Sequence, residues 1–228
     1  MAAEFAEGRR AGFRVVTIDG PAGAGKSTVA RLLADRLGWR FLDTGAMYRA
    51  VALAALRAGV DLADALALDR LTADLRVELP PGRVLLGGED VSRAIRDAAV
   101  TQATRFAADC VEVRSRLVAW QRAFAGTADT VTEGRDQGTI VFPDAHRKFF
   151  VTAADEHRAR RRLAELQSSG AVVDFETVLA DQTRRDAQDA ARAIAPMKPA
   201  DDAEVVDTTR LSVDEVVDLL FQKVAARP

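Results

Sequence analysis

A nine-residue stretch near the start of the chain, GPAGAGKST at residues 20–28, constrains the fold more than any other feature. It matches the pattern G-x-x-x-x-G-K-[ST], with Gly20, Gly25, Lys26 and Ser27 at the fixed positions. A β-branched apolar run precedes it, and apolar residues at helical spacing follow it. The sequence therefore predicts a buried strand, a glycine-rich turn and a helix N-terminus, the context in which this pattern binds phosphate.

The residue types in this loop indicate how a nucleoside triphosphate would be held. Glycines let backbone N–H groups point inward around the phosphates, and the helix N-terminus favours negative charge. We expect Lys26 to reach the β- and γ-phosphate oxygens and Ser27 to offer its hydroxyl to the Mg²⁺ that accompanies ATP. The residues expected to bind ATP are Gly20, Pro21, Ala22, Gly23, Ala24, Gly25, Lys26, Ser27 and Thr28.

Strand and helix patterns alternate over the first sixty residues. After the first helical pattern, which ends at Gly38, a short strand pattern reaches Asp43-Thr44-Gly45, and a second helical pattern ends at Gly59. Such alternation is typical of an α/β protein in which helices cover both faces of a parallel sheet.

The pattern changes between residues 61 and 114, which we interpret as a small insert with its own structure. Residues 75–91 alternate between apolar and polar around Pro80-Pro81-Gly82, which predicts a β-hairpin, and a largely helical stretch follows. Strand patterns resume over residues 129–145 and 148–153, and a last one covers residues 203–209.

Helix start signals mark three elements in the C-terminal half. We expect a capping box from Thr152 to Asp155, an N-cap at Asp174 and a second capping box from Ser212 to Glu215.

Composition excludes several classes of protein. The 228 residues carry a net charge of −2, so there is no overall basic field for a nucleic-acid polymer. Only four of the 32 basic residues are lysine, and a GC-rich genome would explain this arginine bias as well as function would.

The single cysteine, Cys110, forbids an intrachain disulfide and is expected to be a buried structural residue. No apolar run reaches the length of a membrane span, and residues 1–12 read as a flexible leader without a signal peptide. We expect a cytoplasmic protein.

A phosphate-binding loop serves switches, motors and kinases, and the rest of the chain favours a kinase. GTP switches recognise guanine through an N-K-x-D element, and this sequence contains no asparagine. Motors and transport ATPases usually have more chain. A small-molecule kinase instead needs an acceptor site facing the loop and arginines that shield the transferred charge.

Two arginine-rich helical stretches meet that requirement. Arg158, Arg161 and Arg162 share most of one helix face, and Arg185, Asp189 and Arg192 share a face of the next helix. An Arg-Asp-Arg face could bind a sugar hydroxyl and a phosphate. The alternative is a solvated face whose ion pairs are worth tenths of a kcal/mol, which we prefer for Arg160.

The segment EGRDQGT, residues 133–139, ends a predicted strand at the edge where open α/β sheets bind ligands. Glu133 is the candidate for a water-mediated Mg²⁺ carboxylate, and Arg135 and Asp136 would face an acceptor. The alternative is a turn held by local ion pairs.

Five motifs in order along the chain resemble bacterial cytidylate kinases. They are TIDGPAGAGKST, LDTGAMYRA, EGRDQGTIVFPDA, KFFVTA and RRDAQDAARAIAPMKPADDAEVVDT, and the resemblance runs from residue 14 to residue 220. It implies a three-layer P-loop kinase fold over residues 13–228, with residues 61–114 as the monophosphate-binding insert and residues 155–192 as a helical lid. It also implies ATP-dependent phosphorylation of CMP and dCMP in pyrimidine metabolism, by a protein that we expect to be a monomer.

The resemblance assigns roles residue by residue. Catalytic roles would belong to Lys26, Arg158, Arg161, Arg162 and Arg185. The residues that would bind CMP are Thr44, Arg49, Arg114, Arg135, Asp136, Arg185, Asp189 and Arg192. The chemistry of cytosine independently suits Arg114 and Asp136, because a carboxylate accepts from the N4 amine and a guanidinium donates to O2 and N3. Uracil has an acceptor in place of that amine, so Asp136 would disfavour it.

Three positions depart from the family pattern. Arg105 stands where a small serine is usual, Val111 where a proline is usual, and Gln137 where an apolar residue is usual. Arg105 raises the question of whether the cytosine pocket is open. Two alternatives therefore stay in view: a P-loop kinase for another small acceptor such as shikimate, and an inactive nucleotide-binding regulator.

Overall fold

The computed structural model describes residues 12–168 and 170–226. The leader expected over residues 1–12 therefore lies outside the described residues, apart from residue 12. Within the described part of the chain, no helix is both long and apolar enough to cross a bilayer.

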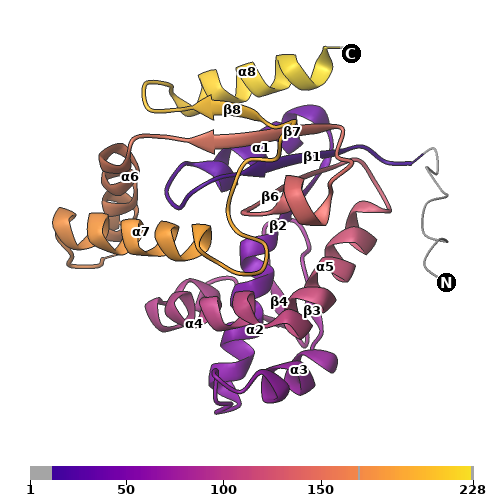
Figure 1. Cartoon of the computed structure of the whole chain (residues 1–228), viewed down its shortest axis with the longest axis vertical. Helices are drawn as coiled ribbons and strands as arrows, with labels where there is room; N and C mark the ends of the chain where they lie inside the picture. The colour runs from indigo at the N-terminus through magenta and orange to yellow at the C-terminus, as the bar shows by residue number, and fades with distance from the viewer. Residues whose placement is uncertain (1–11, 169, 227–228) are drawn as a thin grey trace.

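A five-stranded parallel sheet forms the centre of the molecule (Figure 1). Its order is β2-β6-β1-β7-β8, and the register aligns Asp19 with Gly134 and Asp43 with Glu133. The carboxyl ends of β1, β2 and β6 consequently meet at one edge, where three of the predicted site segments begin. The strands are β1 (Val15–Asp19), β2 (Arg40–Asp43), β6 (Thr130–Gly134), β7 (Arg147–Thr152) and β8 (Glu204–Asp207).

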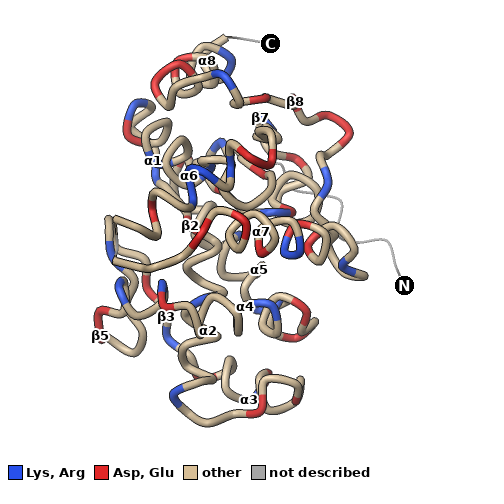
Figure 2. The backbone as a smooth tube through the Cα atoms, turned by 90° about the vertical axis from the view of Figure 1, so that its left-hand side faces the viewer, with Lys and Arg blue, Asp and Glu red and all other residues tan. Residues whose placement is uncertain are grey.

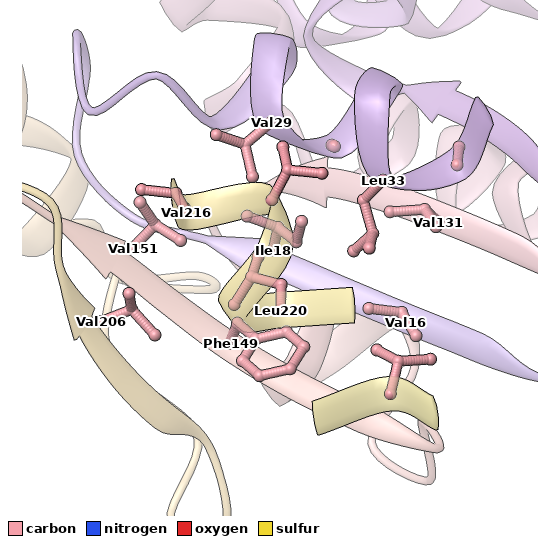
Figure 3. Packing of buried hydrophobic residues seen from close by; sticks show 14 of the residues in the cluster. Val16, Ile18, Val29, Leu33, Val131, Phe149, Val151, Val206, Val216 and Leu220 are labelled. Atoms are coloured by element: carbon pink, nitrogen blue, oxygen red, sulfur yellow. The ribbon is translucent and has the colours of Figure 1, made fainter. Parts of the chain in front are cut away.

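The main apolar core lies between this sheet and two helices, α1 (Lys26–Leu37) and α8 (Val213–Ala225) (Figure 3). Ile18, Leu33, Phe149 and Leu220 are among its fully buried side chains. Strands buried on both faces need continuous apolar runs, and this is why the β1 pattern was readable in the sequence.

The remaining elements of the lower half in Figure 1 form two further apolar clusters that share no residue with the first. The predicted hairpin is confirmed, since β3 (Val77–Glu78) pairs antiparallel with β4 (Leu85–Leu86), and β5 (Glu89–Asp90) adds an unforeseen third strand. The helices here are α2 (Thr44–Arg57), α3 (Ala65–Ala73), the 3₁₀ turn η1 (Ala94–Arg96), α4 (Ala98–Asp109) and α5 (Val111–Ala125).

Two helices, α6 (Asp155–Ser168) and α7 (Phe175–Ala190), pack side by side next to the sheet (Figure 1). Asp174 caps α7 as expected, and the capping box from Ser212 to Glu215 is present. The box expected from Thr152 is wrong, because Thr152 ends β7 and its carbonyl accepts the N–H of Thr208 at 2.8 Å.

The strand expected over residues 129–145 is only partly correct. β6 stops at Gly134, and residues 137–141 form a single π-helical turn, η2. The long-range reason is Asp19 at the end of β1, whose carboxylate accepts the backbone N–H groups of Gln137 and Gly138 at 2.9 and 2.8 Å. These bonds turn the chain away from the sheet.

Candidate active site

The glycine-rich loop joins β1 to α1, as the sequence predicts. Gly20 and Gly25 have φ angles of 142° and 85°, which favour glycine. At Gly20, a Cβ would lie 2.0 Å from the Val151 carbonyl oxygen of β7, so the sheet itself excludes a side chain. A Cβ on Gly25 would meet only a distal nitrogen of Arg161, at 3.9 Å, and the loop is open on that side.

Lys26 is the first residue of α1 and is buried, with its Nζ donating to the Pro21 carbonyl at 2.7 Å. Burial lowers the pKa of Lys26 to about 7, and the positive charges of Arg135 and Arg185 add to this effect. The carboxylates of Glu133 and Asp186 oppose this shift, although Lys26 forms no ion pair within the described residues.

Ser27 and Glu133, the two residues predicted to support Mg²⁺, are in direct contact. Ser27 Oγ donates to Glu133 Oε1 at 3.1 Å. Burial raises the pKa of Glu133, and the nearby carboxylate of Asp43 raises it further, whereas Lys26 and Arg135 oppose the shift. No cluster of three or more His, Cys, Asp or Glu suited to a metal occurs among the described residues. A hydroxyl and one carboxylate fit Mg²⁺ that arrives with phosphates and keeps its waters.

Helices α6 and α7 hold the loop from outside through Arg158 and Asp186. The Ala22 N–H donates to Asp186 Oδ1 at 2.9 Å, and Arg158 Nη1 donates to the Ala22 carbonyl at 2.7 Å. Arg158 also pairs with Asp186 and with Asp155. This buried guanidinium is thus already occupied by protein partners in the free protein.

The other α6 arginines differ from Arg158. Arg161 donates to the carbonyl and the hydroxyl of Thr208 at 2.8 and 3.2 Å and lies beside Gly25. Arg162 pairs with Glu165 at 3.0 Å on an exposed surface, and Arg160 pairs with Glu156 in the same way, as expected for a solvated face.

The two residues expected to recognise the base come together from distant segments. Arg114 of α5 forms an ion pair with Asp136, and both side chains are buried. The Arg114 guanidinium also lies 5.9 Å from the centre of the Tyr48 ring. The two charged groups that the resemblance assigns to cytosine thus neutralise each other in this structure.

The helix face predicted for Arg185, Asp189 and Arg192 is only partly correct, because α7 ends at Ala190 and Arg192 lies beyond it. Arg192 nevertheless pairs with Asp189, which also pairs with Arg135 just after β6. Asp189 accepts from Arg135 Nε at 3.0 Å and from Arg192 Nη2 at 2.6 Å, and Arg192 reaches Asp109 of α4 at 2.8 Å. Burial would raise the pKa of Asp189, but Arg135, Arg192 and Arg185 outweigh it and lower the pKa. Acidic and basic residues are interleaved in this region of Figure 2.

Arg185 is different, because no hydrogen bond or ion pair to it is found within the described residues. It is partly buried, and its pKa is lowered to about 10 by burial and by the positive charge of Arg135. Arg49 is nearly as poorly satisfied: its nearest carboxylate oxygen, on Asp43, is 3.5 Å away, and its Nε has no partner in the described part of the chain. An anion bound between these two guanidiniums would relieve both.

Thr44 and Arg105, two further positions singled out in the sequence, lie in different surroundings. Thr44 opens α2 and donates its hydroxyl to the Glu133 carbonyl at 2.7 Å, which joins α2 to the end of β6. Arg105 is exposed and stacks on the neighbouring Phe106 ring at 4.6 Å, without a hydrogen bond or ion pair to Arg114 or Asp136. Val111 starts α5, a position at which proline is equally suited.

Sequence reasoning missed Asp19, Asp186 and Asp109. Burial raises the pKa of Asp19 to about 6, against the N–H bonds from Gly138 and Gln137 and the charge of Lys26, and repulsion from Asp136 adds to the rise. A signal was present for Asp19, a carboxylate ending a buried strand, and for Asp186, which directly follows Arg185. Nothing in the sequence pointed to Asp109.

Comparison with known proteins supplies the family. The family model for cytidylate kinase matches residues 16–226. The cytidylate kinase of Pelotomaculum thermopropionicum is 50% identical over 219 residues, covering 94% of this chain and 97% of the relative. That of Rhodococcus jostii is 50% identical over 218 residues, covering 93% and 95%.

A solved structure of an uncharacterised protein from Eubacterium ventriosum superposes with a TM-score of 0.52. It is 13% identical and covers 94% of this chain and 99% of that one, a similarity that speaks to the fold alone. The family match and the two relatives span nearly the whole described chain, in agreement with the site geometry. The chain belongs to the cytidylate kinase family.

Proposed function

We propose that the protein transfers the γ-phosphoryl group of ATP directly to CMP and dCMP. The observation that carries this proposal is the buried pair of Arg114 and Asp136, which lies at the same sheet edge as the phosphate loop. Asp136 would accept from the cytosine N4 amine, and Arg114 would donate to O2 and N3. The relatives named as cytidylate kinases support the same acceptor.

The acceptor phosphate would lie between Arg49, Arg135 and Arg185. Two of these guanidiniums, those of Arg49 and Arg185, are poorly satisfied by protein groups among the described residues, and burial together with the positive charge of Arg135 lowers the pKa of Arg185 to about 10. Thr44 would approach the acceptor from the start of α2. Asp189 and Arg192 would contact the sugar, as a carboxylate and a guanidinium can together bind hydroxyl groups.

The donor would lie on the loop of residues 20–28, with Lys26 moving from the Pro21 carbonyl to the β- and γ-phosphates. The Ser27 hydroxyl and, through water, the Glu133 carboxylate would hold the Mg²⁺ that accompanies ATP, which would supply positive charge beside the phosphates. Catalysis then consists of alignment and of electrostatic stabilisation of the transferred group.

Shielding from water would come from α6 and α7. We propose residues 155–192 as the lid and residues 61–114 as the monophosphate-binding insert, whose apolar side chains share two clusters with α2. Arg161, which lies beside Gly25, and Arg162 form no hydrogen bond to the loop among the described residues and could move onto the phosphates, whereas Arg158 would first have to leave Ala22 and Asp186. We further propose a monomeric cytoplasmic enzyme.

An acceptor screen tests the assignment. The purified protein is given ATP and Mg²⁺ with CMP, dCMP, UMP, AMP, GMP or shikimate, and ADP release is followed. CMP and dCMP should show the highest kcat/KM, because cytosine pairs its amine with Asp136 and both of its acceptors, O2 and N3, with Arg114. A clear preference for another acceptor would overturn the proposal.

A further inference from the structure

Gln137, directly after the base-reading Asp136, is buried in a polar network. Only 1% of Gln137 is exposed, and its Oε1 accepts from the Thr132 hydroxyl at 2.9 Å. Its Nε2 donates to Oε1 of the equally buried Gln121 at 3.1 Å. The side chain thus joins β6, which carries Thr132, to α5, which carries Gln121.

The backbone of the same residue is held from a third direction. The N–H groups of Gln137 and Gly138 donate to the two carboxylate oxygens of Asp19. Asp19 ends β1 and immediately precedes Gly20, the first residue of the phosphate loop. Gln137 is therefore fixed relative to the donor side of the site as well as to the acceptor side.

Helix α5 grips two consecutive residues of the turn. Gln121 follows Arg114 by seven residues, which is about two helical turns and places both on the same face. Arg114 binds Asp136 while Gln121 binds Gln137. A shift of the turn by one residue would break both contacts together.

The side chain of Gln137 is tightly packed. A Cβ on Gly134 would lie 2.7 Å from Gln137 Cγ and 3.0 Å from Thr44 Oγ1, so the glutamine stem fills the space beneath the backbone that carries Arg135. The Gln121 Nε2 atom already has no hydrogen-bond partner among the described residues. Loss of Gln137 would leave the whole Gln121 amide unsatisfied in the interior, which is costly.

We propose that Gln137, paired with Gln121, is a positioning residue for the acceptor. Gln137 keeps Asp136 aligned with Arg114, and it keeps Arg135 aligned with Asp189. This role rests on the proposed function, because it is the cytosine and the phosphate of CMP that these residues would meet. Gln137 touches neither ligand in this account and acts through its neighbours.

A double-mutant cycle with methionine, an apolar residue of similar length, tests the role. Gln137→Met and Gln121→Met should each raise KM for CMP about tenfold and leave KM for ATP unchanged, because each strands a buried polar partner. The double variant Gln121→Met/Gln137→Met removes both amides and should recover most of the affinity for CMP. Hydrogen exchange of the Gly138 amide, measured without nucleotide, should speed up in the single variants and slow again in the double variant.

These readouts separate positioning from bulk stability and from the choice of acceptor. A lower melting temperature with unchanged KM for CMP and unchanged Gly138 exchange would overturn the proposal, as would single-variant effects that simply add in the double variant. If the wild-type protein prefers another acceptor, the proposed function fails, yet the exchange measurement and KM for that acceptor still decide the role of Gln137.

Discussion

The donor loop and the acceptor site are built in opposite ways. The proposed donor loop consists of nine consecutive residues, and the groups proposed to hold the phosphates are largely backbone N–H groups whose positions follow from the turn itself. The proposed acceptor site gathers side chains from α2, α5, the segment after β6 and α7, which extend from Thr44 to Arg192 in the sequence. A motif of consecutive residues can thus be recognised in the sequence, whereas a site assembled from distant segments can be recognised only in the folded structure.

Charge is handled differently in the two regions. The loop of residues 20–28 contains a single cation, Lys26. Its Nζ donates to the neutral Pro21 carbonyl, and burial lowers its pKa to about 7. In the acceptor site most cations are neutralised by carboxylates, Arg114 by Asp136 and Arg135 by Asp189. On the proposed assignment, CMP would exchange existing ion pairs when it binds, while ATP would add an anionic partner for Lys26.

The largest expected effect comes from removing the donor cation. Lys26→Ala should lower kcat by about 100- to 1,000-fold, as for other groups that stabilise transition-state charge, with little change in CMP binding. Steady-state kinetics and calorimetry with CMP measure the two quantities, and Lys223→Ala on α8 is the matched control. If the Lys26→Ala variant stayed active, Lys26 would not be the donor cation, and the contrast between the donor loop and the acceptor site would fail.

Asp19, which links the two regions, should give a pH-dependent effect on stability. Its pKa of about 6 in the folded protein exceeds the ordinary value of 3.8, so the folded state binds the proton more tightly than the unfolded state. Stability from this group is complete below pH 4 and is lost as the pH rises to 6 and above, by up to about 3 kcal/mol.

Urea unfolding of the wild type and of Asp19→Asn checks this expectation. The stability of the wild type relative to Asp19→Asn should fall between pH 4 and pH 8, because asparagine does not titrate. The exposed Asp144→Asn variant serves as the control. A wild-type advantage that is the same at both pH values would show that Asp19 titrates normally.

The base-reading pair should give an effect confined to the acceptor. Asp136→Asn should lower kcat/KM for CMP by about 10- to 100-fold and narrow the preference over UMP, since the amide can donate to uracil. KM for ATP should stay near the wild-type value. A variant that lost ATP and CMP affinity in equal measure would indicate that the two regions are not separable, and a melting curve distinguishes unfolding from either outcome.

Arg105 should give the smallest effect. Arg105→Ser introduces the residue usual in the family at a position that is exposed and stacked on Phe106 in this protein. We expect kcat/KM for CMP to stay within about twofold of the wild type, as for most surface substitutions. An increase of tenfold or more would place Arg105 in the acceptor site after all.

The same contrast sets the limits of prediction from sequence. The strand-turn-helix context of the loop, the hairpin at Pro80-Pro81 and the capping box at Ser212 were readable because their determinants lie within a few residues. The end of β6 and the use of Arg158 were not readable. Asp19 bends the chain at Gln137 from 118 residues away, and Arg158 binds Ala22 from 136 residues away. The family resemblance suggested which side chains gather, but not their partners in the free protein.

The two fixed glycines of the loop, Gly20 and Gly25, meet different physical demands. Gly20 faces the Val151 carbonyl at a distance no side chain could share, so the sheet would require glycine there in a chain that bound nothing. Gly25 looks onto open space, and a side chain there would cost only about 1–2 kcal/mol of backbone strain. In a descendant that no longer bound a nucleotide, Gly25 could be replaced by another residue, whereas the sheet would still require glycine at position 20. The presence of Gly20 alone would therefore not indicate an active kinase.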